Sequence, residues 1–450
     1  GNGSYSTADS YVKQVWDGRY TGIRMCNQLL ENIDRVPDLD PELKKRYIGE
    51  AKVLRAYNYY ELYTKFGDIP YTTKVLSIKE SMSIARTDRA TVIANMLADL
   101  DEVINGNYLP TSYDADNKGR ITRWAAMAIK AKIYLFEGNW TQVKNITSTI
   151  MTEGGFTLFG SYAGLFEIAN EYNSEVILDA QYRPTSREHQ MMYVFLPPTL
   201  GGYSQLSPLQ ELVDSYIMLD GKTIKETGTS FDESNPYANR DPRLKATVMY
   251  TGNSYTLADG TEVVINCEKG EGKDGYGVGS DCSATGYYIK KYWDNTYRAT
   301  LYSGLNPILI RYADILLMNA EALAELGELD KMAWDATIKP IRDRAGFTLT
   351  SAVEFPEGAS KDKLIEIVRN ERRSELALEG HRHKDIIRWR IADDVLNGWC
   401  HGLKTNEVVG TDNGYVRVEN RAFNANRHYL WPIPQAERDL NGNLEQNPNW

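Results

Sequence analysis

Repeated long segments of helical periodicity, each ending near a glycine, constrain this chain most strongly. In each segment, apolar or small side chains recur every three or four residues before the glycine stops the helix. The segments cover residues 46–66, 122–138 and 311–327. Thr122 is the predicted N-cap of the second segment, and the alanines of the third would let a neighbouring helix approach closely. The pattern predicts pairs of stacked helices.

Further helices are predicted over residues 8–33, 87–104 and 361–379. The predicted fold is mainly α: a tetratricopeptide-like scaffold of helical hairpins with a long loop-rich, ligand-binding insertion and few short strands. The insertion is rich in Gly, Pro, Tyr, Asn and Ser. We expect one unit over residues 1–450, divided into N-terminal hairpins (1–154), the irregular insertion (155–305), central and C-terminal helical pairs (306–396) and an irregular tail (397–450).

Composition excludes several classes of protein. The net charge is -10 and no Lys/Arg run stands out, so nucleic acid is not an expected partner. No stretch reaches the roughly 18 to 20 apolar residues of a membrane helix. None of the four cysteines forms a C-x-x-C pair, which argues against a zinc ribbon, whereas Cys267 and Cys282 flank a Gly-rich stretch and either pair or stay reduced.

Charged clusters on the C-terminal helices have a structural interpretation. Glu371, Glu375 and Glu379 share one helical face, so they cannot straddle a sugar as a glycosidase requires. We expect them to pair with buried arginines such as Arg55. His381 and His383 point in different directions on a helix, which favours an ion-paired helix end over a metal site. The sequence predicts no catalytic residue, no metal site and no cofactor, and it leaves a structural calcium ion open.

Aromatic residues in the irregular regions are the candidate binding site. The chain has 30 Tyr and 9 Trp, more than packing usually needs. Sugar C–H faces pack on ring faces while hydroxyls bond to amides and carboxylates. Tyr287 and Tyr288 precede the main cluster, and the predicted ligand-binding residues are Tyr292, Trp293, Asn295, Tyr297, Tyr203, Gln205 and Tyr71.

Four segments of the chain resemble the SusD/RagB family of Bacteroidetes. They follow the family's order and span nearly the whole chain. The segments are Gly49–Tyr60 with Phe66–Pro70, Arg311–Leu323, Glu371–Arg382 with Asp385 and Arg388-Trp389, and Leu430–Pro434 with Asn443–Pro448. They are similar to the family's scaffold, so the resemblance assigns no ligand-contacting residue by position.

The resemblance implies a non-catalytic, cell-surface protein that binds an oligosaccharide. It also implies a SusC-like TonB-dependent transporter as partner, and location at the outer membrane as a surface-exposed lipoprotein, through an N-terminal lipid anchor that the printed sequence does not contain. Three alternatives stay open: a peptide-binding RagB-like member, a helical glycosidase, and a plain tetratricopeptide adaptor. The sequence does not identify the glycan.

Overall fold

The computed structural model describes residues 3–296 and 300–450. The chain divides into two compact units. The first unit comprises residues 1–154, 383–397 and 421–450, and the second comprises 155–382 and 398–420. With 44% helix and 10% strand, the fold is mainly helical, which confirms the predicted fold class. Among the described helices, none has both the length and the apolar character needed to cross a membrane.

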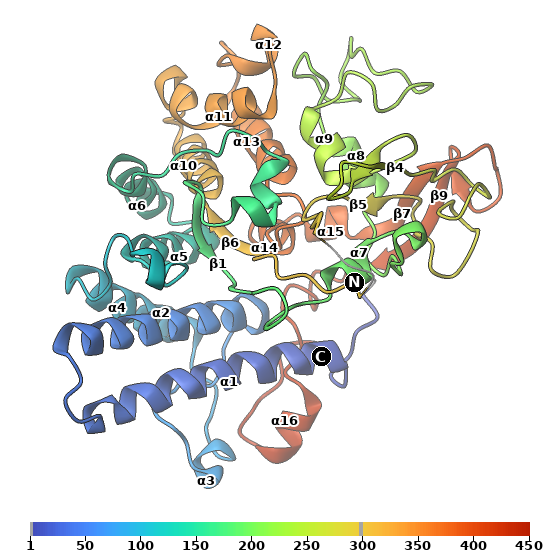
Figure 1. Ribbon diagram of the computed structural model, residues 1–450. Coiled ribbons are helices and arrows are strands. Elements are labelled where there is room, and N and C mark those ends of the chain that lie inside the picture. The colour runs from blue at the N-terminus through green and yellow to red at the C-terminus, as the bar shows by residue number, and fades with distance from the viewer. Residues whose placement is uncertain (1–2, 297–299) are drawn as a thin grey trace. The chain divides into compact units, whose positions relative to one another are not determined.

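Successive antiparallel helices build the first unit. Each long helix packs on the next one along the chain, as the blue to teal ribbons show (Figure 1). These helices are α1 (Ser10–Asn32), α2 (Pro41–Phe66), α4 (Arg89–Asn105), α5 (Arg123–Phe136) and α6 (Trp140–Glu153). Shorter helices are α3 (Ile78–Ser81), α14 (Arg382–Arg388), which enters this unit at His383, α15 (Ala392–Val395) and α16 (Gln435–Leu440).

Local chemistry explains where these helices begin and how they pack. The Thr122 hydroxyl accepts the backbone N–H of Ala125 at 3.3 Å, which confirms Thr122 as the N-cap of α5. Ala125, Ala128 and Ala131 are fully buried. Because these side chains are small, α4 and α6 can pack closely against α5.

The helical part of the second unit is built on α10 (Tyr312–Leu326). This helix packs on both α11 (Lys331–Ala345) and α13 (Lys361–Glu375), and α12 (Thr350–Val353) packs on α11. Gly327 ends α10 in the left-handed conformation (φ 73°), which a glycine adopts without strain. Directly before α10, β6 (Ile308–Arg311) pairs antiparallel with β1 (Val176–Asp179).

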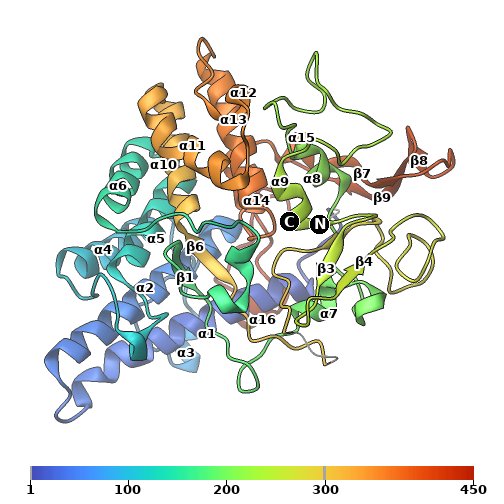
Figure 2. The same cartoon turned by 45° about the horizontal axis from the view of Figure 1, so that its top comes forward.

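The rest of the second unit is loop-rich, as predicted. Its short elements surround a core of buried aliphatic and aromatic side chains that includes Met192, Leu244, Tyr255 and Leu403. The helices are α7 (Met191–Phe195), α8 (Gln210–Ser215) and α9 (Pro242–Thr247). Strand β2 (Val248–Met249) pairs with β5 (Tyr288–Ile289), and β3 (Ser254–Thr256) forms a hairpin with β4 (Glu262–Val264) (Figure 2). A three-stranded sheet has the order β7 (Asn397–Lys404), β9 (Tyr415–Ala422), β8 (Thr411–Asp412).

Cys267 and Cys282 are not joined by a disulfide. Cys267 is buried, and burial raises the pKa of its thiol to about 12. The Cys282 thiol lies 3.3 Å from the carbonyl oxygen of Lys273. Of the two outcomes that the sequence leaves open for this pair, the structure has the reduced one.

Candidate functional site

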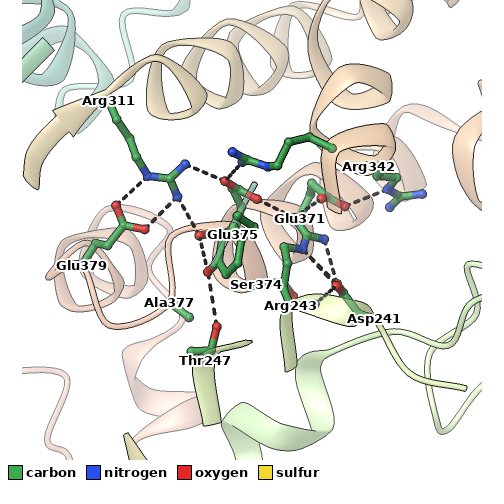
Figure 3. A network of polar contacts seen from close by, with 12 residues as sticks. Asp241, Arg243, Thr247, Arg311, Arg342, Glu371, Ser374, Glu375, Ala377 and Glu379 are labelled. Atoms are coloured by element: carbon green, nitrogen blue, oxygen red, sulfur yellow. Dashed lines mark hydrogen bonds and ion pairs between the residues drawn. The ribbon is translucent and has the colours of Figure 1, made fainter. Parts of the chain in front are cut away.

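A buried network of charges lies in the second unit (Figure 3). Glu375 of α13 accepts from Arg243 at 2.8 Å and from Arg311 at 2.6 Å. Arg311 also bonds Glu379 at 2.7 Å, and Arg243 forms an ion pair with Glu371 at 2.7 Å. All five side chains are at most 1% exposed. The network therefore ties α13 to β6 and α9 through groups that water does not reach.

The pairing of these glutamates with buried arginines is confirmed, but the expected partner Arg55 is wrong. Arg55 lies on α2 in the first unit, where it bonds Asp99 at 2.6 Å and Asn27 at 3.0 Å. Burial by itself would raise the pKa of Glu375, but the charges of Arg344 and Arg311 outweigh it and hold that pKa well below its ordinary range. A carboxylate so firmly ionised is a poor proton donor, which agrees with a structural role.

Lys291 connects this network to the loop that follows β5. Its buried ammonium group donates to the Glu379 carboxylate at 2.7 Å, to the Ala377 carbonyl at 2.8 Å and to the Tyr162 hydroxyl at 2.8 Å. Burial lowers the pKa of Lys291 to about 8, against the opposing charge of Glu379. Because Lys291 is fixed at three points, the residues directly after it start from a defined position.

Trp293 lies on this fixed loop and is half-buried. Its indole N–H donates to the Thr256 carbonyl at 2.8 Å, and its ring centroid lies 5.0 Å from that of Tyr255. Asp294 is buried and accepts from the Ser303 hydroxyl at 2.6 Å. The ring of Trp293 is therefore held by its neighbours and keeps only part of its surface exposed.

Three of the aromatic residues singled out in the sequence are buried, which corrects the expectation that they offer ring faces to a ligand. Tyr292 is 4% exposed, and its ring meets Phe166 edge-on with centroids 4.9 Å apart. Tyr287 and Tyr288 are 2% and 0% exposed within the core of the second unit. Their rings are enclosed because the loop folds back over apolar side chains. Burial raises the pKa of Tyr292 well above its ordinary value.

Three more of the predicted ligand-binding residues are Asn295, Tyr297 and Tyr71. Asn295 is half-buried beside Trp293 in the chain, and Tyr297 lies outside the described residues. Tyr71 belongs to the first unit and is half-buried, with its ring centroid 4.6 Å from that of the buried Tyr59. Burial raises the pKa of Tyr71 to about 12.

Tyr203 is an exposed ring of the predicted set. It is 39% exposed and stacks on Tyr193 of α7, with centroids 4.3 Å apart and planes at 27°. Its backbone N–H donates to the Tyr193 carbonyl at 3.0 Å, and Gln205 beside it is exposed. A Cβ at Gly202 would lie 2.1 Å from the Leu196 carbonyl oxygen, so only glycine fits this turn. The paired rings thus stand on a tightly packed loop.

The Trp293 loop and α7 are linked through Ser303. Besides its bond to Asp294, Ser303 pairs with His189 through two backbone hydrogen bonds of 2.9 and 3.0 Å, just before α7 begins. Tyr302, next to Ser303, is 44% exposed. Trp293 and Tyr193 pack against the same hydrophobic core. We call Tyr193, Tyr203, Trp293 and Tyr302 the aromatic surface.

Sequence reasoning missed Tyr193 and Tyr302 from this set. Tyr193 lies in a helix that is too short for its sequence to show which side chains are exposed. The one sequence feature that could have indicated Tyr193 is its position ten residues before Tyr203. Tyr302 lies five residues after the predicted cluster.

In the described part of the chain, no group of three or more His, Cys, Asp or Glu side chains is placed to hold a metal ion. The geometry suits binding by ring stacking and amide hydrogen bonds.

Comparison with protein families gives two matches along the chain. A family model described as the SusD family matches residues 165–450. A second model, described as starch-binding associating with outer membrane, matches residues 2–135. A SusD-like protein from Formosa agariphila is 28% identical over 409 residues, covering 86% of this chain and 71% of the relative.

Solved structures share the fold. A SusD-like carbohydrate binding protein from Bacteroides fragilis matches with a TM-score of 0.89 and 30% identity, covering 99% of this chain and 88% of its own. A second SusD-like protein from the same organism matches with a TM-score of 0.84 and 28% identity, covering 99% and 87%. A laminarin binding SusD-like protein has a TM-score of 0.67 at 24% identity, covering 97% and 85%, and shows likeness of fold.

Proposed function

Because the chain belongs to the SusD family, whose members are non-catalytic binding proteins associated with the outer membrane, we propose that it captures an oligosaccharide on the aromatic surface. The observation that carries the proposal is the Tyr193–Tyr203 stack, in which one ring is packed and the other is 39% exposed. A ring held from behind loses little conformational freedom when a ligand binds its free face.

The chemistry of this surface favours a neutral, hydroxyl-rich ligand. Flat rings accept the C–H face of a sugar, and exposed Gln205 and half-buried Asn295 supply amide donors and acceptors for hydroxyls. The carboxylate of Asp294 is already used inside the loop. The 30% identical carbohydrate binding protein from Bacteroides fragilis supports the same ligand class.

The proposal also covers the location and the partner of the protein. The protein acts as a surface-exposed lipoprotein of the outer membrane and delivers its ligand to a SusC-like TonB-dependent transporter. The match of residues 2–135 to a model for starch-binding proteins that associate with the outer membrane supports this location.

The test replaces the exposed rings singly after a glycan array has identified a ligand. We expect Tyr203→Ala and Trp293→Ala each to weaken binding by about five- to a hundredfold, the effect of losing one aromatic contact. Isothermal titration calorimetry measures the affinity, and circular dichroism checks folding. Tyr11→Ala is the control, because Tyr11 is 64% exposed and lies in the first unit.

Two results would contradict the proposal. One is unchanged affinity for a verified glycan in both ring variants. The other is displacement of that glycan by a pool of unrelated peptides, which would indicate a peptide-binding member of the family.

A further inference from the structure

A cavity of about 380 Å³ opens within the first unit. It lies at the C-terminal ends of α2 and α5 and the start of α4, and α14 and the C-terminal segment complete it. Its volume falls at the lower end of the range of known ligand pockets, about 300 to 1,000 Å³, and exceeds what one bound ion fills. The lining includes Tyr63, Phe136 and Tyr429 as aromatic walls.

Four arginines line this cavity, although the chain as a whole has a net charge of -10. No Asp or Glu is among its described lining residues. Outside the lining, Glu137 pairs with Arg89, and Asp385 pairs with Arg388 at 2.9 Å. The other two arginines of the lining are Arg390 and Arg427.

Arg390 and Arg427 have no ion-pair partner within residues 3–296 and 300–450. Each guanidinium lies over a ring instead: Arg390 is 3.7 Å from the ring centroid of Tyr429, and Arg427 is 3.9 Å from that of Trp450. Stacking fixes the planes of these two groups but leaves their N–H donors for another partner. The cavity therefore presents two positive charges that the described protein does not neutralise.

Two of the lining arginines also have a buried N–H donor that the protein leaves unsatisfied. The Nε atoms of Arg89 and Arg427 are both buried and have no hydrogen-bond partner in the described structure. A buried donor without an acceptor is costly and uncommon in folded proteins. A planar or tetrahedral oxyanion is the acceptor that guanidinium groups bind best, often through two parallel hydrogen bonds.

We propose that this cavity is a second binding site, which takes the carboxylate or sulfate ester of an acidic saccharide. The anionic group bonds Arg390 and Arg427, and the sugar ring lies against the aromatic walls. The choice of a saccharide rests on the proposed function, whereas the requirement for an anion rests on the cavity alone. The two sites lie in different units, so each can be tested without the other.

The experiment titrates the protein with glucuronate and with glucose 6-sulfate, using glucose and inorganic sulfate as comparison ligands. We expect at least one acidic sugar to bind more tightly than both comparison ligands, and 0.5 M NaCl to weaken that binding. Arg390→Gln and Arg427→Gln should each lower the affinity about tenfold or more, the usual effect of losing a charged hydrogen bond. Arg390→Lys keeps the charge but loses the fork of donors, so it should retain only part of the affinity.

The matched control is Arg417→Gln in the second unit. It removes an exposed arginine of β9 that pairs with Asp412 of β8, and it should leave the affinity unchanged. Three outcomes overturn the proposal: neither acidic sugar binds, inorganic sulfate binds as tightly as glucose 6-sulfate, or the arginine variants bind like the unaltered protein. Loss of acidic-sugar binding in Tyr203→Ala would also overturn it, because the ligand would then occupy the aromatic surface. If Tyr203→Ala and Trp293→Ala leave glycan affinity unchanged, that result contradicts the aromatic surface as a binding site but does not bear on this cavity.

Discussion

The buried ion network and the aromatic surface belong to the same unit, yet they place their side chains in opposite environments. In the network, Glu375 and Arg311 are charged and sealed from water. On the aromatic surface, Tyr203 and Tyr302 are large apolar rings that stay 39% and 44% exposed. Charged groups are normally outside and rings inside, so both regions depart from the ordinary distribution.

On the proposed function, this difference separates residues that hold the fold from residues that meet a ligand. Each buried carboxylate has several cationic partners, so removing one leaves uncompensated charges inside the protein. An exposed ring has few partners, so its removal costs little stability and mainly affects what binds there. Lys291 joins the two regions, because it bonds Glu379 and directly precedes the loop of Trp293.

The largest effect is expected from Glu375→Ala. This change leaves Arg243, Arg311 and Arg344 without a shared carboxylate, and losing one partner of a buried pair typically costs about 3 to 5 kcal/mol. Urea unfolding measures the loss. The control is Glu366→Ala on the same helix, because Glu366 is 62% exposed and its ion pair with Lys363 lies on the surface. Equal stability of the two variants would show that the network does not hold the fold.

Lowering the pH should also destabilise the buried ion network, and this loss of stability should be gradual. The pKa values of Glu371, Glu375 and Glu379 all lie below the ordinary value of 4.5, because nearby cations outweigh burial. Since the folded pKa is depressed, the stabilisation is complete above about pH 5 and is lost as the pH falls through the folded values. Each carboxylate contributes up to about 1.4 kcal/mol per pH unit over that range. Urea unfolding at pH 7, 5, 4 and 3 should show this fall. A flat profile would contradict it.

The scaffold could be predicted from the sequence because its signals are local. Helical periodicity, the Thr122 cap and the glycine after α10 each act within a few residues. The shared face of Glu371, Glu375 and Glu379 correctly indicated buried arginine partners. The identity of those partners depends on contacts between distant segments, such as Glu375 with Arg243, and the expected Arg55 proved wrong.

The aromatic residues of the site were only partly predictable. Tyr292 and Trp293 are neighbours of the same chemical type, yet one is buried and the other half-exposed, because the chain's path after Lys291 decides which ring turns inward. Tyr193 and Tyr302 gain their importance from the Ser303–His189 pairing, which joins segments more than a hundred residues apart. Composition indicated that rings matter, but only folded contacts separate core rings from exposed ones.

We expect the smallest effect on stability from Gly202→Ala. This variant also tests directly how the exposed ring of Tyr203 is held in place. The added Cβ would lie 2.1 Å from the Leu196 carbonyl oxygen, so the backbone must shift, at a cost of about 1 to 3 kcal/mol. That shift moves Tyr203 off Tyr193, and glycan affinity should fall although no ring is removed. Gly160→Ala is the control, because a Cβ at Gly160 meets open space and the change should be neutral or slightly stabilising. Thermal unfolding and calorimetry compare the two variants. If both bind glycan equally well, the turn does not position the ring, and the exposed face of Tyr203 does not depend on its fixed support.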